Sequence, residues 1–170
     1  MNTERTLIIL KPDALQRGIA GEILTRFEKV GLKMIGAKMV APDKEHFHHH
    51  YEDIGKMISR RGQKVFDITL DMMQTGPVLA VVLEGVEAVS LVRKMVGTTE
   101  PKSAPPGTIR GDYSHMSFAY ADDQGVGIPN LIHASGDEEE AKQEISHWFT
   151  DKELYDYHTA HEHFTQVKKK

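Results

Sequence analysis

Residues 75–97 read TGPVLAVVLEGVEAVSLVRKMVG, and this stretch places a strand directly before a helix. Residues 77–85 form a nearly unbroken apolar run between glycine and proline breakers, which is typical of a buried β-strand. Residues 86–97 are predicted to be helical, with Gly97 as the helix stop. A strand that feeds an amphipathic helix predicts a sheet with helices packed against it.

The same alternation continues on both sides of this pair. Further strands are expected at 5–10, 32–40 and 130–133, and further helices between 18 and 31, from Asp43 onward, over 55–75 with a break at Gly62, and after Asp137. The order β-α-β-α-β-α-β, with helices covering one face, predicts an α+β fold of the ferredoxin-like, split-βαβ kind. Its sheet would have four antiparallel strands, with the helices packed around it. The tail over 150–170 is expected to dock in part, with its last few residues loose.

The composition sets limits on the class of protein. A chain of 170 residues with 39% hydrophobic and 27% charged residues is expected to fold as one domain with a single core. The absence of cysteine excludes disulfides and thiolate chemistry, and it fits a reducing cytoplasm. No apolar run is long enough for a signal peptide or a membrane span, so we expect a cytoplasmic protein. A net charge of -4 argues against a general polyanion-binding surface but allows a small cationic pocket.

Several cationic and hydroxyl side chains stand beside backbone breakers. Lys11 ends the first strand, Arg93 lies near the end of the helix over 86–97, and Thr99 follows that helix. Arg110 lies in the long loop over 98–129, and a loop of that length is usually functional or disordered. Such groups suit a polyphosphate, although no Walker motif is present and surface charges are the alternative.

The stretch NLIHASGD, residues 130–137, carries a histidine at the end of a strand. A histidine can act as a nucleophile if a carboxylate holds one ring nitrogen and the other nitrogen faces the substrate. Glu144 on the following helix is a candidate for that carboxylate, and Ser135 could add a hydrogen bond. The alternative is that His133 is a structural histidine.

The run HFHHH over residues 46–50 raises the possibility of a metal site. His46 and His50 are spaced i, i+4, which can place two imidazoles on one helix face. No third ligand and no HExxH motif is evident, so we interpret the run as a hydrated helix face. The same interpretation applies to the tail histidines His158, His161 and His163.

Taken together, these segments resemble the nucleoside diphosphate kinase family. The match runs from about Thr3 to about Tyr157, and its signature segments stand in the family's order. They are RTLIILKPDALQRGIAGEILTRFEKVGLKMIGAKM (5–39), TGPVLAVVLEG (75–85), PPGTIRGDY (105–113), NLIHASGD (130–137) and EISHWF (144–149). Singly each segment is weak evidence, but the combination is highly specific.

The resemblance implies a two-step transfer. A nucleoside triphosphate, mainly ATP, would give its γ-phosphoryl group to His133, and a nucleoside diphosphate would then remove it, which maintains nucleoside triphosphate pools. Mg²⁺ is the implied cofactor, bridging the phosphates and held mainly by them. Glu144 and Ser135 would support the histidine, and Tyr51 would help to position it. Nucleotide contacts are implied for Lys11, Phe66, Arg93, Thr99, Arg110 and Asn130. Of these, Asn130 would bind the sugar 3′-hydroxyl.

This sequence departs from the family pattern at identifiable places. Ala134 replaces the glycine that usually follows the histidine, so its methyl could crowd the site or require a backbone conformation that alanine disfavours. Insertions are expected near 55–66 and 114–129, and an extension over 150–170. Because of the first insertion, the aromatic residue that stacks on the base would fall at Val65 or Phe66.

Two other classes of function remain as alternatives. The departures around the histidine motivate a catalytically impaired, nucleotide-binding regulatory module of the same fold. An RNA-binding ferredoxin-like domain would need RNP aromatics and a basic sheet, and the sequence offers neither. The resemblance also implies a homo-oligomer, and the long tail favours a hexamer over a tetramer. Neither a membrane nor a specific nucleic acid is expected as a partner.

Overall fold

The computed structural model describes residues 3–165, which form one sheet of four strands in the order β2-β3-β1-β4. The strands are β1 (Thr3–Leu10), β2 (Lys33–Val40), β3 (Val78–Val86) and β4 (Ile132–Ala134). Every neighbouring pair is antiparallel. This confirms the predicted four-stranded antiparallel sheet and the strand order of a split βαβ fold.

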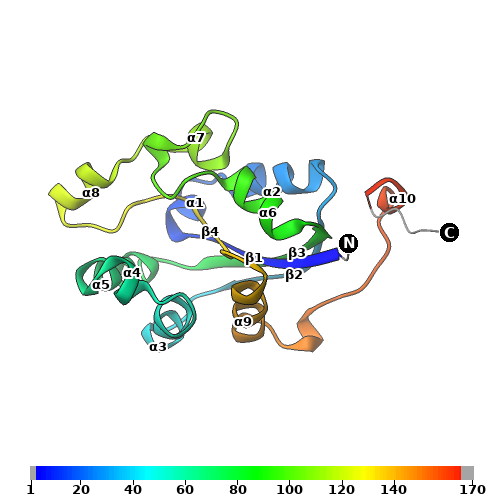
Figure 1. Ribbon diagram of the computed structural model, residues 1–170, viewed down its shortest axis with the longest axis horizontal. Coiled ribbons are helices and arrows are strands. Elements are labelled where there is room, and N and C mark those ends of the chain that lie inside the picture. The colour runs from blue at the N-terminus through cyan, green and yellow to red at the C-terminus, as the bar shows by residue number, and fades with distance from the viewer. Residues whose placement is uncertain (1–2, 166–170) are drawn as a thin grey trace.

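Helices cover both faces of this sheet, as Figure 1 shows. On one side lie α1 (Pro12–Gln16), α2 (Ala20–Lys29), α6 (Ala88–Val96) and α7 (Ile109–Tyr113). On the other side lie α3 (Lys44–His48), the π-helix η1 (His49–Ile54), α4 (Met57–Arg61), α5 (Gln63–Met73) and α9 (Glu138–Trp148). The prediction that helices cover one face was therefore wrong.

The central strand β1 explains why both faces are covered. Its last four residues are fully buried: Ile8 and Leu10 belong to one core cluster, and Leu7 and Ile9 belong to the other. Because successive side chains of a strand point to opposite faces, an unbroken apolar run must be covered on both sides. The predicted helix caps are confirmed, because Asp43 accepts a hydrogen bond from the backbone N–H of His46, and Asp137 begins α9 in the same way.

The long segment over 98–129 contains regular structure. It includes η2 (Pro101–Ser103), α7 and α8 (Phe118–Gln124). The two segments predicted to be insertions form α4 and α8, and they meet where the Arg61 guanidinium lies 6.0 Å from the ring centroid of Phe118. This segment therefore bridges the two helical layers at one end of the sheet.

The C-terminal segment lies along the edge strand β2. It contains η3 (Asp151–Glu153) and α10 (Glu162–Thr165), and the backbone N–H of Tyr155 donates to the carbonyl of Ile35 at 2.7 Å. The docked part of the tail was predicted, whereas the last few residues lie outside the described part of the chain. Between residues 3 and 165, no helix is long and apolar enough to cross a membrane.

Candidate active site

A cavity of about 620 Å³ opens beside the ends of β1 and β4. His133 lies in its floor on β4, paired in register with Ile9 of β1, and its side chain is 19% exposed. The cavity walls come from η1, α4, α6, α9 and the segment between α6 and β4. The sheet therefore fixes His133 at the point where the two helical layers and the long loop meet.

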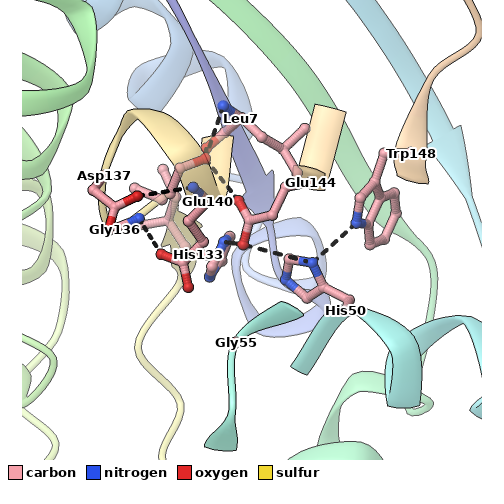
Figure 2. Close-up of polar contacts among 12 residues, drawn as sticks. Leu7, His50, Gly55, His133, Gly136, Asp137, Glu140, Glu144 and Trp148 are labelled. Carbon is pink, nitrogen blue, oxygen red and sulfur yellow. Dashed lines mark hydrogen bonds and ion pairs between the residues drawn. The ribbon is translucent and has the colours of Figure 1, made fainter. Parts of the chain in front are cut away.

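A chain of hydrogen bonds orients the His133 ring, as Figure 2 shows. His133 Nε2 lies 2.7 Å from Glu144 Oε1, and the Ser135 hydroxyl donates to Glu144 Oε2 at 2.6 Å. The same hydroxyl accepts a hydrogen bond from the backbone N–H of Leu7 at 3.1 Å. Because Nε2 is engaged with a buried carboxylate, Nδ1 is the ring nitrogen left for chemistry.

The surroundings keep the His133 imidazole uncharged. Burial, followed by the positive charges of Lys11, Arg110 and Arg93, holds the pKa of His133 well below its usual range. Burial also raises the pKa of Glu144, while the Ser135 hydrogen bond opposes that shift by favouring the carboxylate. We assign an ionised Glu144 that accepts from both neighbours, which leaves a lone pair on His133 Nδ1.

Lys11 and Asn130 form the wall beside the nucleophile. Lys11 Nζ donates to Asn130 Oδ1 at 2.7 Å, and Asn130 Nδ2 donates to the Thr99 carbonyl at 2.9 Å. Burial, and next the charge of Arg110, lowers the pKa of Lys11 to about 8. A cation that is poorly solvated by its surroundings is well prepared to bind an anion.

Arg110 ties the long loop to the nucleophile strand. Its Nε donates to the Asn130 carbonyl at 3.0 Å, and its Nη1 donates to the carbonyls of Gly97 and Thr98, both at 3.1 Å. Its Nη2 donates to the carbonyl of Ile132. Because a guanidinium carries five N–H donors, these bonds leave one of them for a ligand. Burial, and next Arg93, lowers the pKa of Arg110 to about 10, so it stays charged at neutral pH.

The backbone just before the nucleophile is strained. Leu131 has a φ of 72°, and the Ile132 N–H bonds the Asn130 carbonyl at 2.8 Å, which closes a γ-turn. Asp13 accepts from the Leu131 N–H at 3.0 Å, and the Lys11 N–H donates to the Leu131 carbonyl at 2.9 Å. A left-handed conformation costs a leucine about 1–2 kcal/mol, so these two bonds hold the turn in place.

Ala134 does not have the strain that the sequence suggested. It ends β4, pairs with Ile8, and packs its methyl into one of the core clusters with 8% exposure. Its backbone φ is not positive. Its backbone carbonyl accepts from Arg93 Nη1 at 3.5 Å. Alanine therefore fits this position.

His50 is a site residue that the sequence analysis missed. It is 1% exposed, its Nδ1 lies 3.2 Å from Trp148 Nε1, and its ring stands edge-on to His133 at 4.5 Å between centroids. The interpretation of residues 46–50 as a hydrated helix face was wrong here. The spacing of Phe47, His50 and Tyr51, at i, i+3 and i+4, marks one helix face and could have revealed the burial.

The other histidines divide by environment. His46 is half-buried, stacks on His147 with 3.9 Å between ring centroids, and has a pKa that burial lowers to about 4, so it is not on a fully exposed helix face. Of the other histidines that were interpreted as hydrated, His48, His49, His158 and His163 are exposed, whereas His161 is half-buried. The hydrated interpretation is thus confirmed only for the exposed four.

Phe66 lies outside the cavity, which contradicts its expected contact with the base. It is 3% exposed and lies in the core cluster of α5, with an edge-on contact to His48 at 5.3 Å. The reason is helical register, because Phe66, Leu70 and Met73 recur at i, i+4 and i+7 and all face the sheet. Val65 does not line the cavity either.

The remaining predicted residues converge on one place. The cavity is lined by Lys11, Tyr51, Arg93, Thr99, Arg110, Asn130, His133 and Glu144, while Ser135 is fully buried behind it. The ring centroid of Tyr51 lies 6.3 Å from that of His133, and the Tyr51 hydroxyl has no hydrogen-bond partner among residues 3–165. Helix α4 adds cationic lining from Arg60 and Arg61, and apolar lining from Met57.

One group of side chains in the described part of the chain has the spacing of metal ligands. It consists of His50, His133 and Glu144. Two of its three ligands are nitrogens, whereas Mg²⁺ prefers oxygens in an octahedral arrangement. Its atoms are also engaged with one another and with Trp148. The group is therefore not a magnesium site.

Comparison with known proteins identifies close relatives. Residues 4–154 match the family model described as nucleoside diphosphate kinase. The nucleoside diphosphate kinase of Borreliella burgdorferi is 45% identical over 159 residues, which is 92% of this chain and 93% of that protein. The Pyrococcus furiosus nucleoside diphosphate kinase is 46% identical over 166 residues, covering 98% of this chain and 95% of that one.

The solved structures that superimpose well on this chain are also nucleoside diphosphate kinases. The Borrelia burgdorferi nucleoside-diphosphate kinase, solved as a transition state mimic with bound vanadate and ADP, superimposes with a TM-score of 0.93 at 42% identity, covering 96% of each chain. A halophilic nucleoside diphosphate kinase from Halobacterium salinarum in complex with CDP gives a TM-score of 0.82 at 38% identity, covering 96% of this chain and 98% of that one.

Proposed function

The chain belongs to the nucleoside diphosphate kinase family, and from this premise we propose how its own residues carry out the reaction. It is an enzyme that transfers a phosphoryl group from a nucleoside triphosphate to a nucleoside diphosphate. The relatives give no support to the alternative of a catalytically impaired regulatory module.

The observation that carries the proposed mechanism is the 2.7 Å contact between His133 Nε2 and Glu144 Oε1. In the first step His133 Nδ1 forms a bond to the γ-phosphorus while the bond to the bridging oxygen breaks, and the nucleoside diphosphate leaves. Nε2 keeps its proton, and Glu144 stabilises the positive charge that develops on the ring. A second nucleoside diphosphate then reverses the step and removes the phosphoryl group.

The polar lining of the cavity is proposed to bind the phosphates and the sugar. Lys11, Arg93, Arg110 and Thr99 would neutralise and orient the phosphates, because phosphoryl transfer depends mainly on positioning and electrostatic stabilisation. Asn130 would bind the sugar 3′-hydroxyl. The Tyr51 hydroxyl, which has no hydrogen-bond partner within residues 3–165, would help to position the reacting groups, and Ser135 would hold Glu144.

Mg²⁺ is proposed to enter as part of the substrate. The cavity lining combines cations with carboxylates that already hold protein groups, such as Glu144 with His133 and Glu140 with the N–H of Gly136. A metal bound to nucleotide phosphates needs no protein ligand there and would neutralise charge on the phosphates. Broad tolerance of the base is also proposed. It is supported by relatives solved with ADP and with CDP.

The proposed mechanism makes the phosphorylated enzyme an isolable species. Mixing the enzyme with MgATP and no acceptor is expected to release a burst of about one ADP per active site, because the acceptor is needed only for the second step. The isolated phosphoenzyme should then convert GDP to GTP without further ATP. Absence of the burst, with GTP formed only when ATP and GDP are present together, would contradict the two-step route.

The assembly, the location and the domain limits are also proposals. A single domain over residues 1–170 is supported by the one sheet that both core clusters share. A homo-oligomer is supported by exposed apolar side chains near the edge strand and tail, such as Met39 and Tyr155. A hexamer is proposed over a tetramer because of the long C-terminal tail. Mass photometry is expected to give six times the 19.1 kDa chain mass, and four times that mass would refute the hexamer. The lack of cysteine supports a cytoplasmic location, which cell fractionation would check.

A further inference from the structure

One carboxylate oxygen at the site faces two imidazoles. Glu144 Oε1 lies 2.7 Å from His133 Nε2 and 3.7 Å from His50 Nδ1 (Figure 2). All three side chains are buried or nearly so, since those of Glu144 and His50 are 1% and 0% exposed. If His50 carried a proton on Nδ1, that proton would be drawn toward the same oxygen and would compete with the His133 N–H for it.

The neighbouring indole decides where His50 holds its proton. Trp148 Nε1 lies 3.2 Å from His50 Nδ1, and an indole N–H can only donate. His50 Nδ1 must therefore accept, which leaves the single proton of the neutral ring on Nε2. Burial, and next the neighbouring His133, lowers the pKa of His50 well below its usual value, so the second proton is absent too.

We propose that Trp148 and His50 form a tautomer lock for the nucleophile. The indole keeps the proton of His50 on Nε2. Nδ1 then has a lone pair and no proton, so it cannot donate a hydrogen bond to Glu144. Glu144 Oε1 then accepts a hydrogen bond from His133 and none from His50, which fixes the His133 ring so that its Nδ1 faces the phosphate. His50 and Trp148 are thus positioning residues, and this role rests on the proposed function of His133 and Glu144.

The helix geometry couples the two groups. Trp148 and Glu144 are spaced i, i+4 on α9, so they lie one above the other on one face of that helix. His50 comes from η1, where the π-helical turn leaves its ring edge-on to both Trp148 and His133, with centroid distances of 5.6 and 4.5 Å. Helix α9 therefore carries both Glu144, which orients His133, and Trp148, whose N–H prevents His50 from donating to Glu144.

The test removes the donor while keeping an aromatic ring. Trp148→Phe is expected to lower kcat about tenfold with little change in KM, because Glu144 is then shared between two histidines rather than lost. In a His50→Phe background the competitor is gone, so adding Trp148→Phe should change kcat less than about twofold. Equal slowing in both backgrounds would mean that Trp148 acts only through packing, and it would overturn the proposal.

A spectroscopic measurement on the unaltered protein decides the point independently of activity. The ¹⁵N chemical shifts of the His50 ring, identified by their loss in His50→Phe, should show a protonated Nε2 and an unprotonated Nδ1 at neutral pH. A protonated Nδ1 would refute the lock even if the enzyme forms its phosphohistidine. A correct tautomer without phosphoenzyme formation would instead refute the proposed function.

Discussion

His133→Ala is expected to abolish formation of the phosphoenzyme and to lower kcat for exchange between ATP and GDP by at least about 10⁴-fold. The reason is that the variant has no atom in the position of Nδ1, so the transfer loses its covalent intermediate. The neighbouring Lys11, Arg110 and Asn130 still line the cavity, and nucleotide binding should weaken far less than turnover. The measurements are acid-labile labelling with γ-labelled ATP, steady-state exchange, and titration with ADP.

His158→Ala is the matched control for this experiment. The His158 side chain is 93% exposed, and it pairs with Glu162 in the tail, away from the cavity lining. It should label and turn over like the unaltered protein. If His133→Ala labels as strongly as this control, another residue is the nucleophile and the proposed mechanism is wrong.

Arg110→Met is expected to have the second largest effect, on both stability and activity. Methionine keeps an unbranched apolar stem, but it removes the donors that Arg110 now offers to the carbonyls of Gly97, Thr98, Asn130 and Ile132. Of these four, the Asn130 carbonyl keeps its bond from the Ile132 N–H. Because unsatisfied buried acceptors cost about 1–3 kcal/mol each and some will gain water, a net loss of about 3 kcal/mol is expected. Denaturant unfolding would measure it.

The catalytic loss in Arg110→Met should exceed what unfolding explains. At a temperature where the variant remains folded, kcat/KM is expected to fall about 10³-fold, because one phosphate contact is lost and the loop that carries Asn130 loosens. The control is Arg5→Met, since Arg5 forms an exposed ion pair with Glu84 and should cost at most about 1 kcal/mol. Equal losses for the two variants would show that the Arg110 bonds to the loop contribute little.

Local patterns in the sequence predicted the elements of this fold better than they predicted which side chains are buried. The strands and most helices were predicted because apolar periodicity and breakers act locally, as in residues 77–97 and at the caps Asp43 and Asp137. The chemical groups of the site were also readable, because the segments around Lys11 and His133 follow a family pattern. The wrong predictions concern which side chains are buried. His50, for example, was predicted to lie on a hydrated helix face.

The sequence by itself therefore determined the order of the elements and the chemical types that could react. Tertiary structure alone decided which side chains meet and which are withdrawn from solvent. Trp148 and His50 are 98 residues apart, and Lys11 and Asn130 are 119 apart, yet each pair shares a hydrogen bond. Phe66 was predicted to contact the base, but the register of α5 directs its side chain toward the sheet. The physical reason is that periodicity needs only neighbours along the chain, whereas burial and pairing depend on the element packed opposite.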